Sequence, residues 1–92
     1  FTTTELAYAK DNATTLAGNF AVKEAVSKVF GTGFFGVEPY EIEVLRNESG
    51  APYVKLYGNA KEIAKDKQVS RIHVSITNTR EFAQAFAIGE CV

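Results

Sequence analysis

Apolar positions along the chain follow two different spacings, which predict helices in some segments and strands in others. Residues 16–30 carry apolar side chains three and four positions apart, the spacing of a single helix face; these are Leu16, Ala17, Phe20, Ala21, Val26, Val29 and Phe30. The spacing predicts one long helix. Gly31-Thr32-Gly33 follows it, and because glycine readily takes the left-handed conformation of helix C-termini, we expect the helix to end there.

Two shorter helices are expected. Thr2 and Glu5 have capping-box spacing, in which a hydroxyl and a carboxylate bind backbone N–H groups reciprocally at a helix start. Residues 59–67 are charged except for an apolar stripe of Ala60, Ile63 and Ala64, which predicts a surface helix.

Strands are predicted where apolar and polar residues alternate. Residues 41–45 alternate, and a turn at 47–50 leads to an extended segment at 52–56, so these segments predict a hairpin, with Pro52 at a sheet edge. Residues 71–77 and 82–91 alternate as well. In 82–91 one side holds only small residues, which suits close packing against a helix or a neighbouring subunit.

The expected architecture is α+β, with one long helix packed on a small, mostly antiparallel sheet. Ninety-two residues make one domain, 1–92. Folding at this size buries only about 60–65% of the unfolded chain's surface, so stability needs support. Cys91 is the only cysteine and His73 the only histidine, which excludes a disulfide and a zinc cluster as that support. Oligomerisation remains.

Charge and hydropathy exclude several classes of function. The net charge is −1 and the pI is near 5.8, whereas a nucleic-acid-binding domain typically has a basic face. No apolar run is long enough to span a bilayer, and no charged-then-apolar leader precedes the helices. We therefore expect a cytoplasmic protein that binds neither nucleic acid nor membrane.

Glu24 and Lys28 are the candidate chemical groups. They lie four residues apart and so share one helix face. A carboxylate is a hard oxygen ligand that suits magnesium, and an ammonium group suits phosphate. The pair can serve a magnesium-bound pyrophosphate. By spacing alone it can equally be a surface ion pair worth about 0.3–0.5 kcal/mol.

The amino-acid sequence around the pair favours the magnesium–pyrophosphate site over a surface ion pair. Phe-x-x-Lys-Glu-Ala-x-x-Lys, at Phe20 to Lys28, resembles the signature of phosphopantetheinyl transferases. Leu16-Ala17-Gly18 before it and Gly31-Thr32-Gly33 after it are similar to the short, single-domain holo-acyl-carrier-protein synthases. The hairpin segment ending in Gly50-Ala51-Pro52-Tyr53 and the strand Ile72 to Thr77 with Thr79 also resemble that family.

The resemblance implies a 4'-phosphopantetheinyl transferase-like fold and a reaction. The enzyme would transfer 4'-phosphopantetheine from coenzyme A to a serine of acyl carrier protein, with Mg²⁺, releasing 3',5'-ADP. By the same resemblance Glu24 would be a metal ligand and catalytic group, and Lys28 would neutralise phosphate charge. The coenzyme would be bound by Lys28, Gly31, Gly33, Pro52, Ser75, Asn78 and Thr79. A homotrimer with coenzyme A between subunits is implied.

The chain departs from the family pattern at three places. The resemblance leads us to expect an N-terminal Gly-x-Asp strand with a second metal ligand, so the chain reads as N-terminally incomplete. Asn19 stands where arginine is usual, and Asn78 where histidine is usual. Each change removes a charge or a proton carrier from the expected phosphate site. A non-catalytic trimeric relative that binds coenzyme A or a carrier protein is therefore the alternative, and a purely structural domain is a third.

Other residues have two readings each. His73 is either a general base near Ser75 or a surface residue of its strand, and we favour the second. Phe34, Phe35 and Tyr40 are either a lid over a ligand or a plug in the core or a subunit contact. Arg71 and Arg80 can bind a phosphate or an acidic carrier protein, but no neighbouring residue singles them out.

Overall fold

The computed structural model describes residues 1–79 and 81–91 and contains three α-helices, one 3₁₀ turn and four strands. None of the described helices is long and apolar enough to cross a membrane. In chain order the elements are α1 (Thr3–Ala9), α2 (Ala13–Val29), the 3₁₀ turn η1 (Pro39–Glu41), β1 (Ile42–Arg46), β2 (Pro52–Leu56), α3 (Gly58–Asp66), β3 (Val69–Asn78) and β4 (Ala83–Cys91). The expected α+β class is confirmed, with two short helices beside the long one.

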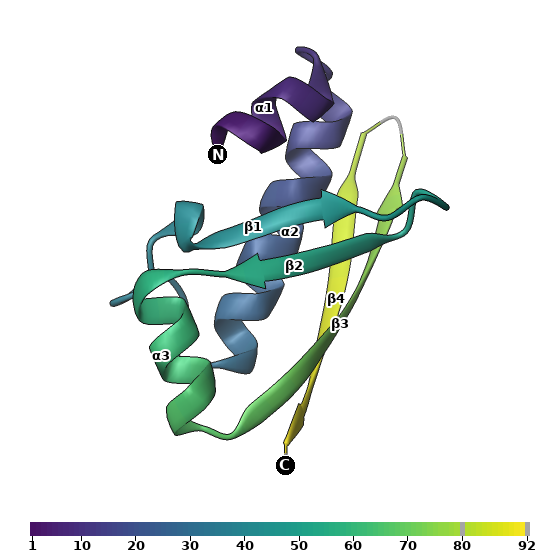
Figure 1. The fold of residues 1–92 in the computed structure, drawn as a ribbon. Helices are drawn as coiled ribbons and strands as arrows, with labels where there is room; N and C mark the ends of the chain where they lie inside the picture. The colour runs from purple at the N-terminus through teal and green to yellow at the C-terminus, as the bar shows by residue number, and fades with distance from the viewer. Residues whose placement is uncertain (80, 92) are drawn as a thin grey trace.

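The strands form two separate antiparallel hairpins, where the sequence led us to expect one sheet. β1 pairs with β2, and β3 pairs with β4. Figure 1 shows the β1–β2 hairpin crossing α2, while β3 and β4 run along it. Side chains of β2 and β3 line a cavity of about 150 Å³, so these two strands are neighbours without a shared hydrogen-bond ladder.

Helix boundaries follow local hydrogen bonds. The α1 capping box is present: Glu5 N–H donates to Thr2 Oγ1 at 3.1 Å, and Thr2 N–H donates to Glu5 Oε1 at 2.7 Å. α2 begins three residues earlier than predicted because Asn12 caps it, accepting a bond from Thr15 N–H at 3.1 Å. At its other end Gly31 has φ of +77°, which confirms the predicted stop.

The apolar core lies between α2, the two hairpins and α3. Its buried members are Val22, Val26, Phe30, Val37, Ile42, Val44, Ala60 and Ala64. Phe20, which the spacing assigned to the apolar face, is instead 40% exposed. The predicted face of small residues in β4 packs against α2: a methyl group at Gly89 would lie 2.8 Å from Val29 Cγ1. The helix alternative for that face is therefore the correct one.

A buried ion pair joins α1, α2 and β1. Lys23 Nζ donates to Glu5 Oε1 at 3.0 Å, and both side chains are fully buried. Lys23 also donates to the carbonyl oxygens of Pro39 at 2.7 Å and Ile42 at 2.6 Å. Glu5 Oε2 accepts the Val44 N–H at 2.9 Å. Burial lowers the pKa of Lys23, and the hydrogen bond to Glu5 opposes that shift. Every donor of the ammonium group therefore has an acceptor.

A second buried carboxylate, that of Glu43, lies near the ion pair. Glu43 on β1 is 7% exposed, although its strand was expected to expose one face. It accepts hydrogen bonds from Thr2 Oγ1 at 2.7 Å and from the Tyr57 hydroxyl at 2.9 Å. The bond to Glu43 is the main cause of a raised pKa for Tyr57. The N-terminus of α1 is thereby held to β1 and to the end of β2.

We expect Lys23→Met to lower the free energy of unfolding by about 3–5 kcal/mol, because it leaves the Glu5 carboxylate buried without its counter-charge. Urea unfolding followed by circular dichroism measures this. Lys28→Met, on the exposed face of the same helix, is the matched control and should change stability by about 0.5 kcal/mol or less. Equal losses in the two variants would contradict the assignment.

Candidate functional site

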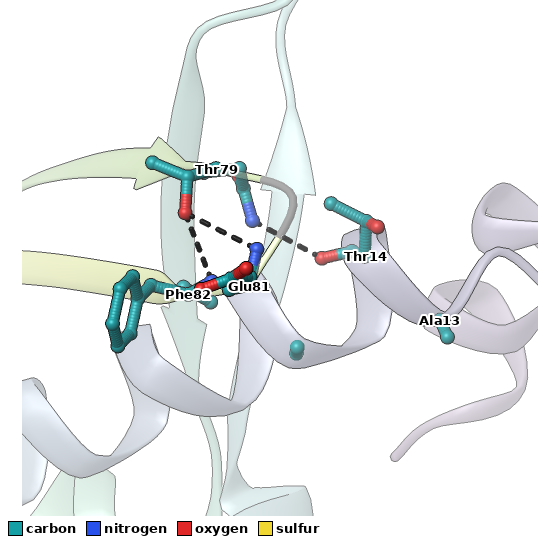
Figure 2. A pocket seen from close by; sticks show the side chains of 8 residues that line it. Ala13, Thr14, Thr79, Glu81 and Phe82 are labelled. Atoms are coloured by element: carbon teal, nitrogen blue, oxygen red, sulfur yellow. Dashed lines mark hydrogen bonds between the residues drawn. The ribbon is translucent and has the colours of Figure 1, made fainter.

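An open pocket of about 210 Å³ lies between the first turns of α2 and the β3–β4 turn (Figure 2). One wall comes from α2 and the other from the strand ends. The lining residues are Ala13, Thr14, Ala17, Asn78, Thr79, Glu81, Phe82 and Ala83. Apolar methyl groups, an aromatic ring and several polar groups therefore meet in one hollow.

Thr79 organises the strand wall. Its N–H donates to the Phe82 carbonyl oxygen at 2.8 Å, and its hydroxyl oxygen accepts from the N–H groups of Phe82 at 2.9 Å and Glu81 at 3.3 Å (Figure 2). These bonds fix the backbone on both sides of the turn. Phe82 is 70% exposed, so its ring is available to a ligand.

Asn78 joins the strand wall to the helix wall. Its Nδ2 donates to the Thr14 carbonyl oxygen at 3.2 Å. Gly18 lies beneath it: a methyl group there would lie 3.3 Å from both amide atoms of Asn78 and 3.1 Å from Ile76 Cγ2. Glycine at position 18 therefore permits the close approach of β3 to α2.

Glu24 and Lys28 continue the same side of α2. They follow Ala17 at intervals of seven and four residues, which places all three on one helix face. At about 1.5 Å per residue, Glu24 lies roughly 10 Å from Ala17 along the helix axis. Both side chains are exposed, and within the described residues neither forms an ion pair with a protein group. The two groups thus face solvent on one side of α2, as the spacing predicted.

Lys23, adjacent to Glu24 in sequence, has a different role. It lies on a buried side of α2 with Asn19 and Ser27. These three polar residues are four apart, so they form a buried polar stripe along α2 rather than a surface face. The four-residue spacing was visible in the sequence, but the buried partners Glu5 and Ile42 were not.

Asn19 does not belong to the open face of α2, contrary to the expectation that it lies in a phosphate site. It is 1% exposed, and its Oδ1 accepts from Arg46 Nη2 at 2.9 Å. Asn19 Nδ2 and Arg46 Nη1 are buried without a hydrogen-bond partner among the described residues. The Arg46 guanidinium lies 5.5 Å from the centre of the Tyr8 ring. Position 19 therefore helps join α1, α2 and β1.

The remaining expected site residues are dispersed. Gly31 and Gly33 follow the C-terminus of α2, with φ of +77° and +57°, and a methyl group on either would face open space. Pro52 begins β2. Ser75 is exposed on the face of β3 away from α2 and pairs with Phe86 of β4. The pocket thus gathers Asn78 and Thr79, whereas the glycines lie beside Lys28 at the other end of the helix.

His73 lies on the same outer face as Ser75, where its Nε2 contacts the Glu90 carboxylate. Both side chains are about half exposed. The surface reading of His73 therefore fits the structure, and the pocket lies elsewhere. Arg71 lines the cavity between β2 and β3 instead of the pocket beside α2. Arg80 lies outside the described residues.

An aromatic patch, formed by Phe1, Phe20 and Phe34, borders Glu24. The Phe20 ring centre is 6.4 Å from that of Phe1 and 5.7 Å from that of Phe34. Outside the patch, Phe35 is 90% exposed and Tyr40 is 57% exposed. Because Phe20 precedes Glu24 by one helical turn, the patch lies next to the carboxylate. Phe35 and Tyr40 do not plug the core.

Glu24 is the exposed carboxylate on this face of α2 that can bind a metal ion. Among residues 1–79 and 81–91, no three His, Cys, Asp or Glu side chains gather at one place. Mg²⁺ usually takes only one or two protein carboxylates and completes its shell with water and substrate phosphates. The exposed Glu24 fits such a site as a single ligand.

A family model described as the 4'-phosphopantetheinyl transferase superfamily matches residues 1–89. The holo-[acyl-carrier-protein] synthase of Lachnoclostridium phytofermentans is 63% identical over 76 residues, which cover 83% of this chain and 62% of that protein. The corresponding protein of Halothermothrix orenii is 44% identical, with 98% of this chain and 74% of that protein covered. The matched region therefore spans about three fifths to three quarters of these relatives' lengths.

Solved structures agree with the sequence comparisons. Helicobacter pylori holo-[acyl-carrier-protein] synthase in complex with coenzyme A has a TM-score of 0.88 and 26% identity, covering 98% of this chain and 76% of that one. Mycobacterium tuberculosis acyl carrier protein synthase has a TM-score of 0.80 and 36% identity, covering all of this chain and 81% of that one.

We expect Thr79→Ala to lower the free energy of unfolding by about 1 kcal/mol, since two backbone N–H groups lose their common acceptor. Thr79→Ser keeps the hydroxyl and should behave like the parent protein. Chemical denaturation of the three proteins makes the comparison. If the serine variant loses as much as the alanine variant, the methyl group rather than the hydroxyl holds the turn.

Proposed function

Because this chain belongs to the 4'-phosphopantetheinyl transferase superfamily, we propose that it transfers 4'-phosphopantetheine from coenzyme A to a serine of an acyl carrier protein, releasing 3',5'-ADP. Two observations on other proteins support the substrates: the relatives are named holo-[acyl-carrier-protein] synthase, and the Helicobacter pylori enzyme forms a complex with coenzyme A. Residues 1–92 belong to a single phosphopantetheinyl transferase-like domain of this enzyme, which acts in the cytoplasm.

The observation that carries this proposal is the exposed pair Glu24 and Lys28. They lie one helical turn apart on a rigid 17-residue helix, in the segment with the transferase signature. The serine oxygen attacks the β-phosphorus of coenzyme A, a new P–O bond forms, and the P–O bond to 3',5'-ADP breaks. The serine proton passes to water. Such reactions depend mainly on positioning and on neutralising phosphate charge.

In this reaction Lys28 neutralises phosphate charge through its ammonium group. Glu24 orients the carrier serine through water and is the residue that would hold Mg²⁺. When bound, the metal supplies charge neutralisation at the diphosphate. The aromatic patch beside Glu24 offers an apolar surface for the incoming carrier protein.

The coenzyme-binding residues fall into two groups. Asn78 and Thr79, at the end of β3, lie beside the start of α2. Lys28, Gly31 and Gly33 lie at the other end of that helix, roughly 15–20 Å away. Pro52 and Ser75 belong to other surfaces of the hairpins. A compact nucleotide cannot contact all of them within one chain, which supports a homotrimer in which neighbouring copies complete each site.

We expect Glu24→Gln and Lys28→Met each to lower kcat/KM by about 10²-fold or more, because each removes charge that stabilises the transition state. The assay contains coenzyme A, apo-acyl-carrier-protein and Mg²⁺, and mass spectrometry follows modification of the carrier. Glu62→Gln on the exposed face of α3 is the matched control and should keep full activity.

The outcomes separate the alternatives. No mass gain by the parent protein in the presence of Mg²⁺ would overturn the enzymatic proposal. Calorimetric binding of coenzyme A that is indifferent to Glu24→Gln, without turnover, would instead support the non-catalytic relative.

We expect Phe86→Glu to convert the trimer to a monomer. Phe86 and Ile88 are 67% and 65% exposed on the outer face of the β3–β4 hairpin, which gives neighbouring copies an apolar surface. A carboxylate buried there without a partner is costly. Sedimentation velocity measures the mass, and Lys61→Glu on α3 is the control. A trimer that survives Phe86→Glu would place the interface elsewhere.

A further inference from the structure

Asn78 occupies an unusual place between the two walls of the pocket. The helix wall consists of Ala13, Thr14 and Ala17, and the strand wall is the turn held by Thr79. Among the described residues, the bond from Asn78 Nδ2 to the Thr14 carbonyl oxygen is the one hydrogen bond that joins these walls. Figure 2 shows this dashed line running from the strand end to the helix backbone at Thr14.

The same amide lies close to the backbone of Gly18. Its nitrogen and oxygen would both be 3.3 Å from a methyl group at position 18, so the amide lies over the bare Cα of Gly18. A methyl group at that distance would be closer to the amide than ordinary van der Waals packing allows. The amide therefore occupies space that a side chain at position 18 would fill, and the Thr14 carbonyl orients it.

Two consequences follow for the side chain's chemistry. One of the two N–H groups on its Nδ2 donates to the helix backbone at Thr14. Its Oδ1 accepts no hydrogen bond from the described residues. Removing the amide would leave the helix wall and the strand wall joined through apolar contacts alone.

We propose that Asn78 is a positioning residue, which sets the width of the pocket by tying the end of β3 to the first turn of α2 across Gly18. This rests on the proposed function, because the pocket is taken to bind part of coenzyme A. This role belongs to the N–H group bound to Thr14 and is separate from any ligand contact made by the second N–H group of the same amide.

The kinetic test is Asn78→Ala. Loss of one hydrogen bond between the walls should raise KM for coenzyme A about three- to tenfold, with kcat within about twofold, because the reacting groups at Glu24 and Lys28 are untouched. Gly18→Ala should raise KM in the same way, since its methyl group displaces the amide without removing it. Asn59→Ala is the matched control: Asn59 Nδ2 also donates to a backbone carbonyl oxygen, that of Gly36, at 3.3 Å and in an exposed position.

The KM and kcat values of these variants decide the proposal. KM within about twofold of the parent value in both Asn78→Ala and Gly18→Ala overturns the proposal, as does a fall in kcat with unchanged KM, which would place Asn78 at the reacting atoms. Failure of the parent protein to transfer the group overturns the proposed function instead. In that case nuclear Overhauser effects between the Asn78 side-chain amide protons and Gly18 Hα test the contact directly. Their presence in the parent protein and their loss in Gly18→Ala support the proposal, and their absence from the parent protein overturns it.

Discussion

The buried contact between Glu5 and Lys23 is the constraint on which the rest of this small structure depends. An ammonium group and a carboxylate that leave water both lose solvation, and they recover it only when every donor and acceptor finds a partner. Here α1 supplies the carboxylate, α2 the ammonium group, and the segment from Pro39 to Val44 the backbone acceptors and donor. Elements far apart in sequence are thereby held at one mutual position.

Because Lys23 is fixed inside, its neighbour Glu24 is directed outward. One helix thus has two polar faces with opposite roles: the buried stripe of Asn19, Lys23 and Ser27 holds the fold, and the open face of Ala17, Glu24 and Lys28 is available for chemistry. The ion pair also sets the rotation of α2 about its axis, which fixes where the exposed carboxylate lies relative to the aromatic patch and the pocket.

Much of this could be predicted from local patterns. The capping box at Thr2, the stop at Gly31, the β1–β2 hairpin and the alternation of β3 depend on neighbouring residues, and all are present. The start of α2 was misplaced because the capping side chain of Asn12 lies in a polar stretch that has no helical spacing. The separation into two hairpins was missed because it depends on side chains packed between β2 and β3.

The site was predictable only in part. The spacing of Glu24 and Lys28 placed them on one face, since helix geometry is local. Asn19 and Phe20 were assigned to the wrong surroundings because their environments come from Arg46 and from Phe34, which lie 27 and 14 residues away in the sequence. Likewise, no local signal indicated that Gly18 and Asn78 would meet.

The close approach of Gly89 to Val29 restricts how β4 can slide along α2. Were β4 to slip by two residues along α2, Ala87 or Cys91 would take the place of Gly89, and a side chain would collide with the Val29 methyl group. The β3–β4 hairpin is therefore restricted to one register along α2, which also fixes the position of Thr79 beside the start of that helix.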